Sequence, residues 1–220
     1  RDNRRSRGLG DVYKRQVRNT GAAYCWGYAN FGVLGNGTTT PDVTTPSLVS
    51  GGYSWTKVMT ASTSACGLRT NGSIYCWGNG VNGQLGNGTT TGTFSTPQIV
   101  LGGYTFTDMS ASVWGACGLR NTGATYCWGG NFRGEAGNGA TNDGPHTSPI
   151  LVTGGPTWAD IEVGFQGTCG ITTSDDLYCW GDDADGEVGN GLPNANVNVP
   201  TLVSGAVSYT HLTLPTKLAV

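Results

Sequence analysis

The sequence predicts an all-β fold of the β-propeller class, built from four-stranded blades. The tetrapeptide Tyr-Cys-Trp-Gly occurs four times, with its cysteines at 25, 76, 127 and 179, a period of 51 to 52 residues. Glycine makes up 38 of the 220 residues, and each glycine costs a helix about 1 kcal/mol relative to alanine. Each unit also contains about four short apolar runs separated by Gly, Asn, Thr and Pro, which is typical of a propeller blade.

The second unit shows how the elements of one blade are assigned. Its four expected strands are 55–59, 65–69, 73–77 and 98–101, joined by turn residues. A Gly-Asn-Gly turn follows each Tyr-Cys-Trp-Gly, and a proline is expected to open the fourth strand of every unit. These prolines are Pro46, Pro97, Pro149 and Pro200. At a period of 51 to 52 residues, the repetitive part of the chain amounts to about 3.7 repeats.

The two middle strands of each unit form a predicted hairpin that brings two cysteines together. Gly72 suits the left-handed position that closes a three-residue loop at 70–72. This register places Cys66 opposite Cys76 in a non-hydrogen-bonded pair, where Cα atoms about 4.5 Å apart suit a disulfide. The same register pairs Cys117 with Cys127 and Cys169 with Cys179. Position 15, opposite Cys25, is an arginine, so the seventh cysteine has no partner.

Regular cysteine pairs predict an oxidising compartment. We therefore expect an extracellular or cell-surface location, with the periplasm as a variant of it. Reduced, buried cysteines are the main alternative, and zinc ligation is a weaker one because each hairpin offers only two ligands.

Both ends of the chain differ from the repeats. Residues 1–16 and 207–220 contain DVYKRQ and VSYTHL. One oligonucleotide that resembles a sequencing adapter can encode both, one on each strand. We expect both segments to be adapter-derived and 17–206 to be an internal propeller fragment. That interior has five basic and twelve acidic residues, a net charge of −7, which excludes a nucleic-acid footprint.

The motif Cys-Gly-Leu, six residues, Tyr-Cys-Trp-Gly, followed by a Gly-rich loop and a Pro-led apolar run, resembles the repeat of the regulator of chromosome condensation family. The resemblance extends over 17–206 and implies part of a seven-bladed β-propeller. The paired cysteines are more like those of bacterial, secreted members. The Gly-Gln-Leu-Gly motif is kept only at 83–86, and no residue matches the family's insertion for nucleotide exchange on a small GTPase.

The sequence carries no signal for catalysis, a cofactor or a membrane span. No apolar run approaches 20 residues, and no nucleophile, zinc-protease or phosphate-loop motif is present. The four motif tryptophans suit packing between blades, with a sugar- or protein-binding ring as the alternative. Each motif tyrosine is expected to lie over the glycine opposite it, as Tyr75 over Gly67.

One acidic cluster is a weak calcium candidate. Asp183, Asp185 and Glu187 alternate around a glycine, as carboxylates do in part of a calcium loop, but a complete EF-hand pattern is absent. Drift on a solvated loop is the alternative, since the equivalent loops of the other repeats are neutral.

The loops vary between repeats while the frame stays constant, which is typical of binding surfaces on rigid scaffolds. The candidate binding residues are Phe31, Gln84, Phe132, Arg133, Glu135 and His146. We therefore expect a non-catalytic module that recognises a protein partner, or else a glycan. The alternative is an intracellular regulator of the guanine-nucleotide-exchange type.

Overall fold

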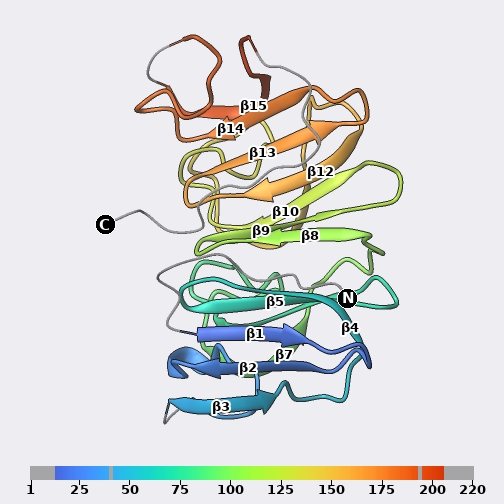
Figure 1. Cartoon of the computed structure of the whole chain (residues 1–220). Coiled ribbons are helices and arrows are strands. Elements are labelled where there is room, and N and C mark those ends of the chain that lie inside the picture. The colour runs from blue at the N-terminus through green and yellow to red at the C-terminus, as the bar shows by residue number, and fades with distance from the viewer. Residues whose placement is uncertain (1–12, 40–41, 193–194, 206–220) are drawn as a thin grey trace.

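The computed structural model describes residues 13–39, 42–192 and 195–205, which form four antiparallel sheets. Figure 1 shows the sheets following one another from the blue N-terminal one to the orange-red C-terminal one. The predicted all-β propeller architecture is confirmed. In every sheet the strands are hydrogen-bonded in chain order.

The first sheet has three strands and the other three have four. The first contains β1 (Tyr13–Val17), β2 (Ala23–Gly27) and β3 (Val43–Leu48), with the short 3-10 helix η1 (Asn30–Gly32). The second contains β4 (Trp55–Thr60), β5 (Ser64–Arg69), β6 (Ile74–Asn79) and β7 (Thr93–Ile99). The third contains β8 (Asp108–Ala111), β9 (Gly115–Leu119), β10 (Thr125–Gly129) and β11 (His146–Leu151). The fourth contains β12 (Trp158–Val163), β13 (Gly167–Thr172), β14 (Leu177–Gly181) and β15 (Val197–Leu202).

The hairpin register is confirmed in each sheet. Cys66 lies opposite Cys76 and Gly67 opposite Tyr75, as the loop at 70–72 requires. Gly72 has a φ of +83°, and the amide of Gly72 donates to the carbonyl of Arg69 at 2.9 Å, which closes the turn. The same left-handed position in the fourth sheet is occupied by Asp175, with a φ of +64°.

The fourth strand of the second blade differs from the prediction. It runs over Thr93–Ile99 rather than 98–101, and Pro97 lies inside it instead of opening it. The register with β6 shifts between Cys76 and Gly78, so the strand bulges there. Because β7 is an edge strand, a proline at the bulge removes no hydrogen bond that the ladder needs. The other sheets repeat this arrangement.

In the second, third and fourth blades, an aromatic ring at the start of the first strand or just before it covers the hairpin glycine. A Cβ atom on Gly67 would lie 2.6 Å from the ring of Trp55, and Gly118 and Gly170 meet Phe106 and Trp158 in the same way. The expectation that the motif tyrosines cover these glycines is therefore wrong. The tyrosine lies opposite the glycine in the register, but the ring nearest to the glycine comes from the start of the adjacent first strand or from just before it.

The structure describes only a few residues of the two segments expected to be adapter-derived. Residues 207–220 and 1–12 lie outside the described residues, and their adapter origin stays a prediction. Residues 13–16 belong to β1 and pair with β2, with Arg15 opposite Cys25 as the register predicted. Backbone pairing does not depend on where these residues come from, so it leaves their origin open. Within the described residues no helix is long and apolar enough to cross a membrane.

Candidate functional site: the loop rim

Two sets of loops meet at one end of the blades, and we call this surface the rim. In each complete blade, the amide after the motif glycine donates to a carbonyl in the loop between the first two strands. The pairs are Asn79 to Thr63 at 2.9 Å, Gly130 to Trp114 at 2.8 Å, and Asp182 to Gln166 at 2.8 Å. The rim therefore comprises 61–63 with the loop after β6, 112–114 with the loop after β10, and 164–166 with the loop after β14.

The motif tryptophans tie each blade to the one before it. The indole N–H of Trp77 donates to the carbonyl of Val33 at 2.8 Å, across the boundary between the first two blades. Trp128 donates to Gln84 and Trp180 to Glu135 in the same way, at 3.2 and 2.9 Å. These three indoles are fully buried, so they pack between blades and are not available to bind a glycan.

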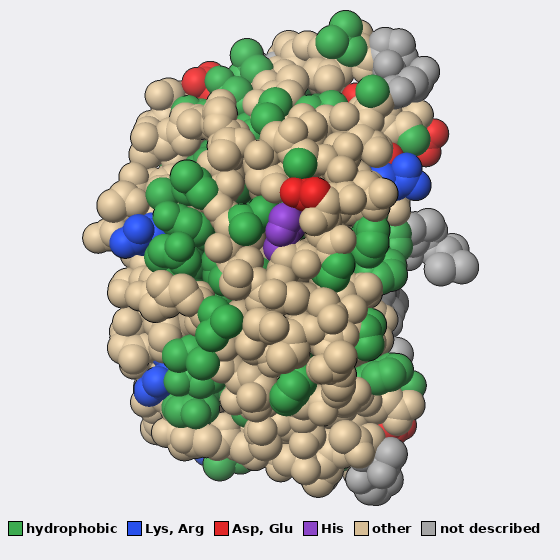
Figure 2. Space-filling view, turned by 180° about the vertical axis from the view of Figure 1, so that it is seen from behind, with side chains coloured by type: hydrophobic (Ala, Val, Ile, Leu, Met, Phe, Trp, Pro, Cys, Tyr) green, Lys and Arg blue, Asp and Glu red, His purple; other side chains and the backbone are tan. Residues whose placement is uncertain are grey.

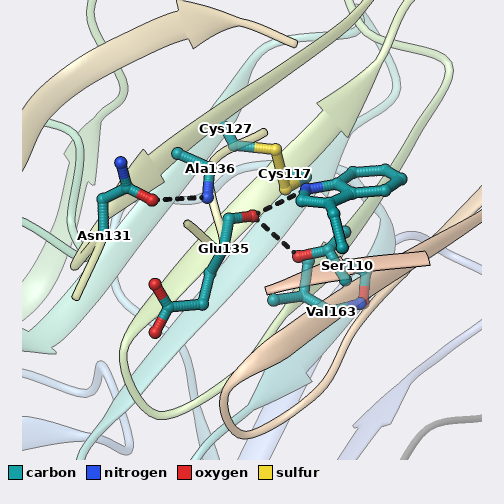
Figure 3. Close-up of a disulfide and its surroundings, with 9 residues drawn as sticks. Ser110, Cys117, Cys127, Asn131, Glu135, Ala136 and Val163 are labelled. Atoms are coloured by element: carbon teal, nitrogen blue, oxygen red, sulfur yellow. Dashed lines mark hydrogen bonds between the residues drawn. A yellow bond between two sulfur atoms is a disulfide. The ribbon is translucent and has the colours of Figure 1, made fainter. Parts of the chain in front are cut away.

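Two of the predicted binding residues are buried rather than displayed. The side chains of Gln84 and Glu135 accept hydrogen bonds from loop amides two residues earlier, those of Asn82 and Arg133. Figure 3 shows the carbonyl of Glu135 facing the next blade, while its carboxyl group points away from the nearby disulfide. Both residues build the loop, although Glu135 has a second carboxyl oxygen without a partner.

The other predicted binding residues differ in exposure. Phe31 and Phe132 are both 41% exposed, and the side chain of Arg133 is 46% exposed. His146 is largely buried against Asp143, with Nε2 at 3.1 Å from the carboxylate. Sequence reasoning missed Val81, which is more exposed than either phenylalanine, as is Leu192.

The loop around His146 is organised by a buried amide. Asn131 donates to Asp143 and to the carbonyl of Ala140, and its side-chain oxygen accepts from the amide of Ala136 (Figure 3). Hydrogen bonds from Asn131, Asn138 and His146 keep the pKa of Asp143 below its ordinary value, against the opposing effect of burial. His146 therefore stabilises this loop.

The structure does not assemble the calcium candidates into a site. Asp183 is buried, and its carboxylate accepts from the amide of Val188 at 3.0 Å. Glu187 accepts from the amide of Asp185, so two of the three carboxylates shape the loop. Over the described ranges, no group of three or more His, Cys, Asp or Glu side chains could hold a metal ion.

Each complete blade contains a disulfide beneath its rim loops. Cys66–Cys76, Cys117–Cys127 and Cys169–Cys179 are bonded, with Cα atoms 4.0 to 4.1 Å apart. Cys25 remains a buried thiol. Burial raises the pKa of Cys25 to about 12 although Arg15 lowers it, so this thiol is protonated and inert.

A second group of charges lies on the first strands of the blades. Lys57 on β4 forms an ion pair with Asp108 on β8 at 2.8 Å. Glu162 lies on β12 of the next blade. Burial raises the pKa of its carboxyl group to about 7, and this effect is larger than the lowering of that pKa by Lys57 and by a hydrogen bond from Ser110. These groups connect the second, third and fourth blades.

The sequence analysis did not predict a recess that lies at the rim between the third and fourth blades. It is a small hollow lined by Trp114, Glu135, Phe165 and the Cys117–Cys127 disulfide, among others. Trp114 and Phe165 belong to no repeated motif. When the repeats are aligned, they occupy the positions of Thr63 and Ser62 in the loop between β4 and β5, so only an alignment reveals these aromatic residues.

Charged side chains are sparse on the face shown in Figure 2, and hydrophobic ones form separate clusters.

Two repeats of the chain match models of one family. Both models describe the regulator of chromosome condensation (RCC1) repeat, and they match residues 71–119 and 158–187. Curated relatives include the human E3 ubiquitin-protein ligase HERC2, 29% identical over 89% of this chain but only 4% of its own length. The Arabidopsis thaliana ultraviolet-B receptor UVR8 is 25% identical over 88% of this chain and 44% of its own.

Solved structures show the same architecture. Human WBSCR16 superimposes with a TM-score of 0.83 at 18% identity, over 94% of this chain and 54% of that one. Yeast RCC1 (Prp20), solved bound to Kap60, has a TM-score of 0.76 at 16% identity, over 89% and 47%. The chain thus spans about half of these structures and less than half of the two curated relatives. The repeat matches show that the chain contains regulator of chromosome condensation (RCC1) repeats, and the solved structures share its β-propeller fold.

Proposed function

We propose that the chain is a non-catalytic binding module, secreted or at the cell surface, that recognises a protein partner through its rim. The observation that carries the proposal is that the rim keeps its backbone while its side chains change. The same amide–carbonyl bond joins the loops in three blades, yet the residue supplying the carbonyl is Thr63, Trp114 or Gln166. Variable side chains on a constant frame are the usual basis of recognition.

The rim also exposes apolar side chains that a protein interface would bury. Val81 and Phe132 lie in the rim loops and are 51% and 41% exposed. Aromatic residues are enriched at the centres of protein interfaces. Related structures support a protein partner. Yeast Prp20 was solved bound to Kap60, and its binding to Gsp1p and histones was studied with its crystal structure. A secreted location is supported by the three hairpin disulfides.

Site-specific photo-crosslinking tests this function. A photoreactive phenylalanine analogue is placed at Phe132 on the rim, which is 41% exposed, or at Ile99 at the end of the edge strand β7, which is 50% exposed. The oxidised full chain is then exposed to the extracellular proteins of the source organism. We expect one partner to be cross-linked from position 132 and not from 99, and to bind in purified form.

Cross-links from both positions alike, or from neither, would contradict rim recognition. If the chain isolated from its source has free thiols throughout and is cross-linked to a small GTPase, the intracellular exchange-factor alternative replaces the secreted module.

A further inference from the structure

We propose that the recess between the third and fourth blades receives the cationic end of a lysine or arginine side chain of the partner protein. The inference rests on the proposed function, because it assigns a chemistry to one part of the rim. Two features support it, namely the aromatic surface of the recess and the buried carboxylate oxygens without hydrogen-bond partners. The equivalent position in the second blade has neither feature.

Trp114 and Phe165 line the recess, and Phe132 packs against Trp114 from a third loop. Trp114 lies between Phe132 and Phe165, with ring centroids at 6.0 and 6.1 Å and steeply inclined planes. All three side chains are partly or substantially exposed. The face of an aromatic ring is electrically negative, and tryptophan attracts cations most strongly.

Two carboxyl groups from adjacent blades have a buried oxygen without a hydrogen-bond partner. Glu135 lines the recess and is 8% exposed, and its Oε1 atom is buried without a hydrogen-bond partner. The Oδ1 atom of Asp182 is buried and unpartnered as well. Burial raises the pKa of Glu135, and the negative charge of Asp182 adds to this effect. Buried polar atoms without partners are rare and costly, and an ammonium or guanidinium group would supply N–H donors to both.

Arg133 satisfies this need only in part. Its Nε atom lies 4.0 Å from Oδ2 of Asp182, which is longer than a hydrogen bond, and its side chain is half-exposed. Arg133 therefore offsets some of the negative charge from outside without filling the recess. A cation from a partner would compete with it, so removing Arg133 should strengthen binding.

The equivalent position of the second blade lacks this chemistry. Gln84 replaces Glu135 and makes the same loop contact through Oε1, while Thr63 stands in place of Trp114. In the fourth blade Glu187 again makes the loop contact but is exposed. The chain thus supplies its own controls. Glu135→Gln and Trp114→Thr install residues that the second blade already accommodates, and Glu187→Gln is the matched change outside the recess.

The test is a titration of the oxidised full chain followed by the indole N–H resonance of Trp114, which the Trp114→Thr variant assigns. The probes are N-acetyl-argininamide and N-acetyl-lysinamide, with the uncharged N-acetyl-norleucinamide as control. We expect saturable shifts with the two cations and none with norleucinamide. Glu135→Gln should weaken binding roughly ten-fold, since it removes a charge-assisted hydrogen bond. Arg133→Ala should tighten it, and Glu187→Gln should leave it unchanged.

Equal binding of norleucinamide, no shift with either cation, or unchanged binding to Glu135→Gln would overturn the proposal. Retention of the native disulfides and of the other indole resonances shows that each variant is folded. A partner that is cross-linked from position 132 and binds Glu135→Gln undiminished would leave the proposed function standing and remove only this inference. Cation binding without any rim partner would remove the proposed function instead.

Discussion

At the scale of single residues, glycines allow the tryptophan of the next blade to reach the loop backbone. Gly35, Gly86 and Gly137 have φ values of +62 to +67°, which side chains rarely adopt. A Cβ atom at any of them would lie 2.6 to 2.8 Å from the indole above. Backbone conformation and close approach thus require glycine for separate reasons.

A matched pair of substitutions separates these two requirements. Gly86 and Gly103 share a φ of +62°, but a Cβ atom on Gly103 would meet nothing within 4 Å. We expect Gly103→Ala to cost about 1 to 2 kcal/mol from the left-handed backbone alone. Gly86→Ala should cost roughly 1 to 3 kcal/mol more, because it also displaces Trp128. Urea unfolding of both variants measures the difference, and equal losses would contradict the close approach.

A pH-dependent contribution is expected from Glu162. The pKa of its carboxyl group is raised from 4.5 to about 7, first by burial, so the folded state holds a proton that the unfolded state has lost. Stability is therefore unaffected below about pH 4.5, falls as the pH rises to about 7, and stays reduced above it. Glu162→Gln should stabilise the protein by about 2 kcal/mol at pH 8, after allowance for partial exposure, and by almost nothing at pH 4. Thermal unfolding at the two pH values checks this, and an equal effect at both would refute it.

At the scale of elements, the hairpin of the two middle strands is the unit that the sequence predicts best. Its loop conformation, register and cysteine pairing all follow from local chemistry, namely a left-handed residue four positions before the second cysteine. The edge strand was predicted poorly, because Pro149 and its equivalents lie at a bulge that only pairing with the previous strand creates. The rings that cover Gly67, Gly118 and Gly170 were predicted wrongly. The hairpin sequence identifies the tyrosine opposite each glycine, but it does not show which residues of the neighbouring strand pack over that glycine.

Removing one hairpin disulfide tests the contribution of this element. The double variant Cys117→Ala with Cys127→Ala opens a loop of about 11 residues, worth roughly 3 kcal/mol in the chain-entropy model. We expect the fold to persist, because the strands remain paired on both sides. Denaturant unfolding under non-reducing conditions gives the loss. Unchanged stability would mean that the disulfide does not constrain the unfolded chain.

At the scale of the whole molecule, the blades are coupled by repeated contacts across their boundaries. The buried indole bonds join successive loops, and the Lys57–Asp108 ion pair joins successive first strands. Trp26 is only half-buried, whereas its three equivalents are fully buried between sheets. The sequence showed which residues recur, but the recess depends on loops of two blades meeting, which no single repeat reveals.

A substitution across one boundary tests this coupling. Trp77→Phe leaves the buried carbonyl of Val33 without its donor and should cost about 2 to 4 kcal/mol. Trp26→Phe makes the same change at a half-buried position and should cost less than about 1 kcal/mol. Comparable losses in urea unfolding would show that burial between blades does not distinguish the two sites.

The most direct test of a rigid, oxidised propeller that displays its rim is peptide mapping by mass spectrometry without reduction, on the full chain isolated from its source. The account predicts bridges at 66–76, 117–127 and 169–179, with Cys25 unmodified by alkylating reagents until the protein unfolds. Seven free thiols in folded protein would contradict the oxidised frame and the secreted function that rests on it.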